Sequence, residues 1–450
     1  MTAPLAQALL EHKGKDPVSF HTPGHKGRIG GFPFADVDFT ELPGLDDLHH
    51  PTGVLAEAQT LAAATFGADL SFFLVNGSTV GNQAMVMAAC PPGRKILLPR
   101  NAHHSVLSGI ILSGAIPVYL EPVWDPLLGA AQNLEVDTVA EALRNHPDAA
   151  AVLILHPTYW GCVSDLEKIA SLVHQFGKIL LVDEAHGAHF SFHPELPMSA
   201  LEAGADLVVQ STHKTLGSLT QSSMLHRKGE KIPLERLQKT LRLLQSSSPS
   251  YLLMASLDLA RQQMAREGAG KINGLLEMIR WTKERLEGIP GISPHFFPDC
   301  FAQDPTKFVL DFEGISGEDV LDLLHEQGLD LELSSQNSVL ALCSIGNEFS
   351  DFERLLAALG TISEIREGEK KFFSVPPPLP DLALSPREAF FAESEVFSLD
   401  SCLGRICAEA IAPSPPGIPV LVPGERISRE VLDFLASLPG EFGGKIRVVA

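Results

Sequence analysis

The chain lacks two features that particular protein classes need, namely an excess of positive charge and an unbroken apolar run. Its 450 residues carry 34 lysines and arginines against 55 aspartates and glutamates, a formal net charge of −21. Nucleic-acid binding needs a basic face, so this balance argues against a nucleic-acid partner. The apolar stretch at residues 105–120 is broken by Gly109, Gly114 and Pro117. We therefore expect no membrane-spanning segment there and no membrane partner.

The sequence also shows no paired-cysteine motif, no pattern typical of a signal peptide and no metal-binding motif. The six cysteines form no C-x-x-C pair, and a chain of this length needs no disulfides, so they are predicted to be free thiols in a reducing compartment. No basic segment followed by an apolar one opens the sequence, so no signal peptide is expected. There is no H-E-x-x-H motif, and His186 with His189 lacks a third ligand at a recognisable spacing. These absences predict a cytoplasmic protein without a metal centre.

Helical and strand-like segments alternate between about residues 55 and 230. Short strand-like segments occur at residues 95–98, 151–155, 178–182 and 206–210, with helical periodicity between them. The segment 151–155 is apolar throughout, and each of the others has an apolar run after an initial charged residue. Such runs are typical of parallel strands that are covered by helices on both faces. The fold class predicted is α/β with a mainly parallel sheet. Ligands of such sheets bind at the carboxyl ends of the strands.

Two charged side chains follow strands of this kind. Lys214 comes just after the apolar run 207–210, among small hydroxyl residues, and Asp183 closes the run 180–182. Alone, each is more often an ordinary surface lysine or strand-end aspartate. Together they are the pair that pyridoxal 5′-phosphate (PLP) requires. The lysine forms a Schiff base when burial keeps its amine neutral, and the carboxylate keeps the pyridine nitrogen protonated.

The segment 76–82 lies between a predicted strand and a predicted helix and contains Ser78 and Thr79. Backbone N–H groups at a helix N-terminus together with two hydroxyls make an anion site, which suits the PLP phosphate. The alternative is that Ser78 or Thr79 simply caps the helix. Ser211 and His213 are candidates for further donors from the opposite side of the phosphate.

Two loops hold further candidates. His103 follows another strand and is placed to stack on the pyridine ring, although capping of the next helix is the alternative. The acidic loop at residues 38–49 contains Glu41, Asp46 and Asp47, which suit a cationic substrate side chain. A solvated charged loop is the alternative there.

Several motifs together resemble the Orn/Lys/Arg decarboxylases, which are PLP enzymes of the aspartate aminotransferase fold. They cover nearly the whole chain and lie at residues 21–26, 40–48, 76–82, 183–187, 211–216, 248–258, 384–390 and 415–425. The resemblance implies that Lys214 is the Schiff-base lysine, Asp183 the pyridinium partner and His103 the stacking residue. It implies further cofactor contacts from Ser78, Thr79, Ala185, His186, Ser211 and His213.

The resemblance also implies the reaction, which is decarboxylation of a basic L-amino acid that feeds polyamine synthesis. Arginine, giving agmatine, is the first choice of substrate, and lysine or ornithine the next. His213 or Lys214 would protonate the substrate Cα, and Glu332 would join the acidic loop in binding the cation. The alternatives are another PLP reaction on this fold, such as transamination, or a catalytically silent regulatory paralogue.

The same resemblance predicts the organisation of the chain. We expect an N-terminal arm (1–50), a PLP-binding large domain (51–290) and a smaller C-terminal α/β region (291–450) with a proline-rich connector at 374–380. The chain is similar to the short members without an N-terminal wing domain. A homodimer or higher homo-oligomer is expected, with active sites at the dimer interface and residues 247–248 approaching the neighbouring site. His104 and Ser414 depart from the family pattern, and Ser414 bears on substrate identity.

Overall fold

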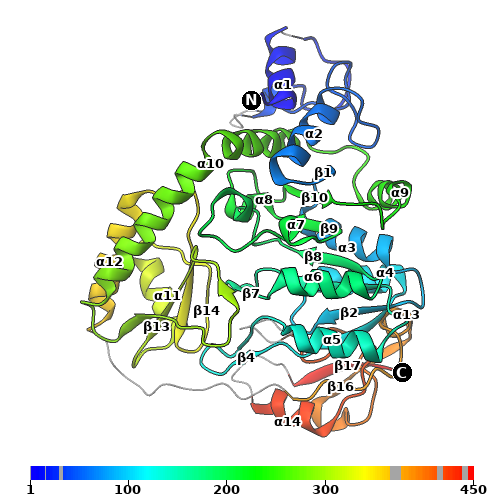
Figure 1. Ribbon diagram of the computed structural model, residues 1–450, viewed down its shortest axis with the longest axis vertical. Coiled ribbons are helices and arrows are strands. Elements are labelled where there is room, and N and C mark those ends of the chain that lie inside the picture. Colours follow the sequence, from blue (N-terminus) through cyan, green and yellow to red (C-terminus); the bar gives the residue numbers. More distant parts are fainter. Residues whose placement is uncertain (1, 16, 30–33, 365–376, 413–418, 438–443) are drawn as a thin grey trace. The chain divides into compact units, whose positions relative to one another are not determined.

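The computed structural model describes residues 2–15, 17–29, 34–364, 377–412, 419–437 and 444–450 (Figure 1). The chain divides into two compact units, each assembled from separate stretches of sequence. The first unit comprises residues 1–89, 179–274 and 344–346, and the second comprises residues 90–178, 275–343 and 347–450. The domain division expected from the sequence stays a prediction.

The first unit holds strands in the order β1, β10, β9, β8. Their bounds are β1 Leu70–Leu74, β10 Ser223–Arg227, β9 Leu207–Gln210 and β8 Ile179–Asp183. β8 and β9 are parallel, whereas β10 runs antiparallel to both β9 and β1. β9 and β10 are buried along their whole length, as expected for strands covered on both faces.

The helices of this unit are α1 Pro4–Gly14, α2 Val54–Phe66, α3 Gly77–Ala89, α7 Ala200–Ala203, α8 Thr212–Thr215 and α9 Leu234–Leu244, with 3₁₀ turns at Ala35–Val37 and Phe190–Phe192. The long helix α10, Tyr251–Leu286, contributes residues to both units. Helix α3 contacts β8, β9 and β10. A Cβ atom on Gly81 would lie 2.3 Å from Val209 Cγ2, so only glycine permits α3 to approach β9 this closely.

The second unit contains parallel strands in the order β6, β2, β3. They are β6 Ala151–Leu155, β2 Lys95–Pro99 and β3 Ile116–Leu120, accompanied by α4 His104–Ser113, α5 Val136–Asn145 and α6 Leu166–Gln175. Two short antiparallel pairs follow. They are β4 Trp124–Asp125 with β5 Ala130–Ala131, and β7 Cys162–Val163 with β12 Ala302–Gln303.

A separate antiparallel sheet in this unit has the order β11, β13, β15, β14. Its strands are β11 Ile292–Pro294, β13 Lys307–Phe312, β15 Ser338–Leu342 and β14 Leu333–Ser334, with helices α11 Gly317–Glu326 and α12 Phe349–Ile362. Phe308, Phe312, Leu324 and Phe352 are buried in one hydrophobic cluster, which joins the sheet to the helices.

The C-terminal residues of the second unit form a small core of their own around Cys402, Val431 and Ile446. The elements are α13 Pro386–Phe391, β16 Ser394–Ser398, a 3₁₀ turn Leu399–Ser401, α14 Arg429–Ser437 and β17 Lys445–Val449. The Arg100 guanidinium ties residues near this core to the segment after β2. It donates to both carboxylate oxygens of Glu425, at 2.6 and 2.8 Å.

The predicted α/β class with a mixed, mainly parallel sheet is confirmed. The predicted strands at 95–98, 151–155, 178–182 and 206–210 lie within one residue of the observed elements. Strand β10 was not predicted from the sequence. No helix in the described part of the chain is long and apolar enough to cross a membrane. All six cysteines are free, as predicted.

Candidate functional site

Asp183 ends β8 in the first unit, and its carboxylate is only 2% exposed. The Asn82 side chain, from α3, donates from Nδ2 to Oδ2 at 2.7 Å, and the Ala185 N–H donates to Oδ1 at 3.1 Å. Both carboxylate oxygens are therefore held by neutral donors. The close approach of α3, which Gly81 permits, brings Asn82 within reach of Asp183.

Lys214 lies in the single turn α8, which directly follows β9. Its Nζ lies 2.9 Å from Nε2 of His186, which is almost fully buried. An ammonium group only donates hydrogen bonds, so this contact requires an unprotonated Nε2 and places the imidazole proton on Nδ1. Because β8 and β9 are parallel, Asp183 at the end of β8 and Lys214 just after β9 lie at the same edge of the sheet, as the sequence predicted.

Three hydroxyls gather at the N-terminus of α3. Ser78 Oγ lies 2.8 Å from Ser211 Oγ and donates to Ser223 Oγ at 3.3 Å, which leaves Ser211 as the donor in the first contact. Thr79 is the next residue of the helix. Nearby in the chain, the buried hydroxyl of Thr212 has no hydrogen-bond partner. The first-turn N–H groups of α3 and these hydroxyls form a donor-rich place that suits an anion.

His213 is held in one tautomer. Its Nδ1–H donates to the Ser222 carbonyl at 2.7 Å, so the lone pair of the neutral ring lies on Nε2. Burial lowers the pKa of His213, and the positive charge of Lys214 lowers it further against the effect of the Ser222 hydrogen bond. His213 is therefore neutral at physiological pH, with Nε2 able to accept a proton.

A buried chain of hydrogen bonds beside Asp183 was missed from the sequence. Glu184 accepts from the Gln210 amide at 2.6 Å, Gln210 Oε1 lies 3.1 Å from His226 Nε2, and His226 Nδ1 lies 2.7 Å from Ser71 Oγ. Burial raises the pKa of Glu184 to about 8 although two donors oppose the shift, and burial lowers the pKa of His226 to about 3. The chain connects β9, β10 and β1 and fixes the strands that carry Asp183 and Lys214.

The acidic residues of the loop at residues 38–49 have two different roles. Asp46 accepts backbone N–H bonds at the start of α2, from Thr52, Gly53, Leu55 and Ala56. Burial by itself would raise the pKa of Asp46, but the Thr52 and Gly53 hydrogen bonds outweigh it and lower the pKa. Asp46 therefore caps α2 and has little capacity left for a ligand.

Glu41 and Asp47 instead line an open hollow of about 250 Å³, together with His49, His50, Arg242 and Ser247. His49 Nε2 lies 2.8 Å from the Ser246 carbonyl. The two carboxylates and Arg242 share one small space, so the hollow already contains a cation of the chain itself.

Two of the residues predicted for the site belong to the second unit. Nδ1 of His103 accepts the Ser105 N–H at 3.3 Å and lies 2.7 Å from the Ser105 hydroxyl, so His103 caps α4. Its ring centroid is 3.9 Å from that of His104. Glu332 is exposed and accepts a hydrogen bond from the Tyr159 hydroxyl. The Ser414 departure lies outside the described residues. In the described part of the chain, no group of three or more His, Cys, Asp or Glu side chains is arranged to hold a metal ion.

Comparison with known proteins gives consistent results. Residues 3–302 match the family model described as Orn/Lys/Arg decarboxylase, major domain, and residues 367–443 match the C-terminal domain of the same family. The chain is 41% identical to an arginine decarboxylase of Bacillus anthracis, over 96% of this chain and 92% of the relative. It is 40% identical to the arginine decarboxylase of Bacillus subtilis over the same shares.

Solved structures show the same fold. The lysine decarboxylase LdcF of Francisella novicida superimposes with a TM-score of 0.82 at 22% identity, covering all of this chain and 81% of that one. The extent of the family match and the identity to the Bacillus proteins go beyond a likeness of fold. The chain therefore belongs to the Orn/Lys/Arg decarboxylase family and is an amino acid decarboxylase.

Proposed function

We propose that this enzyme removes the α-carboxylate of arginine as CO₂ and releases agmatine, with PLP as its cofactor, and so supplies polyamine synthesis. The geometric observation that carries the proposal is the shared sheet edge of the buried Asp183 carboxylate and Lys214. The choice of arginine is supported by the Bacillus relatives at 40% and 41% identity, which are named arginine decarboxylases.

The residues present fit PLP. The proposed Schiff-base lysine is Lys214, and the proposed partner of the pyridine nitrogen is Asp183. The donor-rich N-terminus of α3, with Ser78, Thr79 and Ser211, suits the phosphate. The buried hydroxyl of Thr212 has no hydrogen-bond partner, which supports a further polar group there. When bound, PLP supplies an electron sink for the pair of electrons released as CO₂ leaves.

Each side chain has a distinct task in this proposal. Asn82 and the Ala185 N–H orient Asp183, which would hold the ring nitrogen of bound PLP in its protonated form. His186 accepts a hydrogen bond from Lys214 and positions its amine. After CO₂ has left, one proton must be added to Cα. Lys214 Nζ would deliver it, or His213 Nε2 would do so after it has itself taken up a proton, since both groups lie on α8.

The substrate cation needs acceptors. Glu41 and Asp47 are proposed because their carboxylates face an open hollow, whereas Asp46 is occupied by the backbone of α2. The roles predicted for His103 and Glu332 and the homodimer also stay proposals. An exposed apolar surface of α1 and α10 in the first unit, which includes Leu10 and Leu259, is consistent with a subunit contact.

The test is an amine-product screen with arginine, lysine and ornithine on enzyme purified with PLP. We expect equimolar CO₂ and agmatine from arginine and at least about tenfold lower kcat/KM for the other two substrates. A lysine or ornithine preference would overturn the substrate assignment only. Formation of a keto acid in place of CO₂ would favour transamination. Absence of both activities, together with absence of the yellow absorbance of bound PLP, would favour a silent regulatory paralogue.

A further inference from the structure

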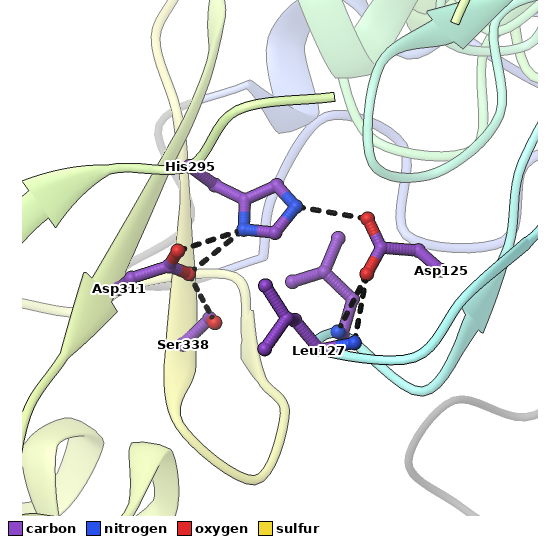
Figure 2. Close-up of polar contacts among 6 residues, drawn as sticks. Asp125, Leu127, His295, Asp311 and Ser338 are labelled. Atoms are coloured by element: carbon purple, nitrogen blue, oxygen red, sulfur yellow. Dashed lines mark hydrogen bonds and ion pairs between the residues drawn. The ribbon is translucent and has the colours of Figure 1, made fainter. Parts of the chain in front are cut away.

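A buried cluster of three ionisable side chains lies in the second unit, apart from the residues assigned above. His295 follows β11 and stands between two carboxylates (Figure 2). Its Nε2 lies 2.9 Å from Asp125 Oδ2, on β4, and its Nδ1 lies 2.9 Å from both oxygens of Asp311, on β13. The Ser338 hydroxyl donates to Asp311 at 2.6 Å. Both imidazole nitrogens therefore face acceptors, which requires the doubly protonated ring.

The cluster carries a net negative charge. Burial alone would lower the pKa of His295, but its hydrogen bonds to Asp125 and Asp311 outweigh burial and raise the pKa to about 9. Asp125 is likewise kept ionised, because His295 and the N–H groups of Leu127 and Leu128 lower its pKa against the effect of burial. One imidazolium between two carboxylates leaves one unit of negative charge.

This cluster forms part of the wall of a pocket of about 450 Å³. Phe296 and Phe297 add apolar surface, and Asp299 adds a third carboxylate. The residues that line the pocket include no lysine or arginine. A cationic ligand is therefore favoured over an anionic one, and aromatic side chains add to the attraction for an organic cation.

A second, independent feature of the wall points to a ligand. Gln132 is one of the residues that line the pocket, is only 4% exposed, and has no hydrogen-bond partner for either its amide oxygen or its amide nitrogen. The indole N–H of Trp124 in the same wall is also unpaired. An unsatisfied buried polar group costs about 1–3 kcal/mol, so a group that pairs with the Gln132 amide would recover part of this cost.

We propose that this pocket binds a small organic cation, an alkyl ammonium or alkyl guanidinium that carries no carboxylate. The N–H groups of the cation would donate to Gln132 Oε1, and its charge would be balanced by Asp299 and the His295 cluster. The apolar chain would lie along the phenylalanine and proline side chains of the wall. A carboxylate on the ligand would be repelled by three acidic side chains, so the pocket distinguishes amines from amino acids.

A metal ion is a poorer occupant. The oxygens of Asp125 and Asp311 already accept hydrogen bonds from His295, the backbone and Ser338, and no metal-binding group occurs among the described residues. The proposed cation has the chemistry of a decarboxylation product rather than of a substrate. That link to turnover rests on the proposed function, whereas binding at the pocket does not.

Cys300 provides a reporter inside the pocket. It lines the pocket and is half-exposed, whereas the other five cysteines are buried. Its thiol donates to the Ala302 carbonyl at 2.7 Å, and a hydrogen bond from Cys162 lowers its pKa against the effect of burial. The rate of Cys300 alkylation by iodoacetamide, followed by peptide mass spectrometry, therefore reports occupancy of this pocket and not of the active site.

The experiment compares two probes that share a guanidinium group on the PLP-loaded enzyme. Agmatine ends in an amine, and 4-guanidinobutyrate ends in a carboxylate and is not an α-amino acid, so neither is turned over by a decarboxylase. We expect saturable protection of Cys300 by agmatine, about tenfold when agmatine is at ten times its Kd, and little protection by 4-guanidinobutyrate. Absence of protection by agmatine, or equal protection by both probes, would overturn the proposal.

Two variants test the wall itself. Gln132→Leu removes the unpaired amide, and Asp299→Asn removes an exposed charge with little risk to folding; both should weaken the protection by agmatine. The matched controls, Gln175→Leu on α6 and Asp433→Asn on α14, change exposed residues elsewhere and should keep it. Undiminished protection in both pocket variants would contradict the proposal. Because decarboxylation is measured separately, failure of the pocket and failure of the proposed reaction give different results.

Discussion

Two of the acidic sites described above, at Asp183 and at Asp125 with Asp311, use negative charge in different ways. In the described residues, Asp183 is held by neutral donors alone, the Asn82 amide and the Ala185 N–H. Asp125 and Asp311 instead share a cation of the chain itself, His295. A carboxylate that lacks an internal cation keeps its full charge for a cationic group from outside, whereas carboxylates that share an internal cation stabilise the fold and keep only a residual charge. Asp183 can therefore face one strongly charged group, whereas the His295 cluster joins chain segments and attracts a cation more weakly.

The largest effect is expected at Lys214. Lys214→Ala removes the proposed Schiff-base amine and should lower kcat for arginine by on the order of a thousandfold or more. Decarboxylation assays with radiolabelled arginine measure it, and the thermal unfolding midpoint serves as the control because the side chain is only half-buried. Turnover within tenfold of the unmodified enzyme would remove Lys214 from the mechanism.

His295→Gln tests the other side of the comparison. Loss of the shared cation leaves the buried Asp125 and the partly buried Asp311 without a positive partner and should lower the free energy of unfolding by about 3 kcal/mol. Denaturant unfolding at pH 7, with the second unit monitored by hydrogen exchange, measures this loss. A variant as stable as the original protein would show that the cluster contributes little to the fold.

The same residue predicts a pH dependence of stability. The pKa of folded His295 is raised to about 9 from the ordinary 6.5, so its stabilisation is fully present below pH 6.5. It should decline as the pH rises and be lost above about pH 9. In the His295→Gln variant this decline should be absent, and a slope as steep as that of the original protein would assign the decline to other groups.

Asp183→Asn should have the next largest effect. The amide keeps the size of the side chain but removes the charge that would face the pyridine nitrogen, so kcat should fall by about a hundredfold. PLP absorbance distinguishes this outcome from cofactor loss, since Lys214 and the phosphate donors are unchanged. Unaltered kcat with bound PLP would mean that the neutral surroundings of Asp183 have no catalytic purpose.

The smallest expected effects are those that distinguish the role of Asp46 from the role of Glu41. Asp46→Asn weakens the cap of α2 and should lower the free energy of unfolding by about 1 kcal/mol with KM unchanged. Glu41→Gln should instead raise KM for arginine and leave the unfolding midpoint unchanged. The reverse pattern would exchange the roles assigned to the two carboxylates.

Sequence reasoning correctly predicted the position of residues that a local sequence pattern marks. Asp183 and Lys214 each follow a short apolar run, and parallel strands that end together bring such residues to one edge. It could not find the His295 cluster, since Asp125, His295 and Asp311 come from separate elements and have no fixed spacing. Strand β10 was missed because Ser223, His226 and Arg227 look like exposed residues. In the structure, His226 is buried and neutral between Ser71 and Gln210.

The acidic loop at residues 38–49 shows a different limit of prediction from sequence. Glu41, Asp46 and Asp47 are equivalent by composition, and only the positive φ of Asp46 and its backbone partners show that it serves as a helix cap. Likewise, the unpaired amide of Gln132 is invisible in the sequence because pairing is a property of the folded core. Such distinctions depend on hydrogen bonds between residues whose proximity the sequence pattern does not encode.

The hydrogen-bonded series Ser71–His226–Gln210–Glu184 limits which substitutions these positions can accept. Every proton in it has a set direction, because Gln210 must donate to Glu184 and therefore accept from His226, which must in turn accept from Ser71. Exchange of one member leaves its neighbour with a donor facing a donor or an acceptor facing an acceptor. A substitution that removes the donor or acceptor of one member therefore leaves a buried polar group of its neighbour unpaired, which costs about 1–3 kcal/mol unless the neighbour is replaced with it.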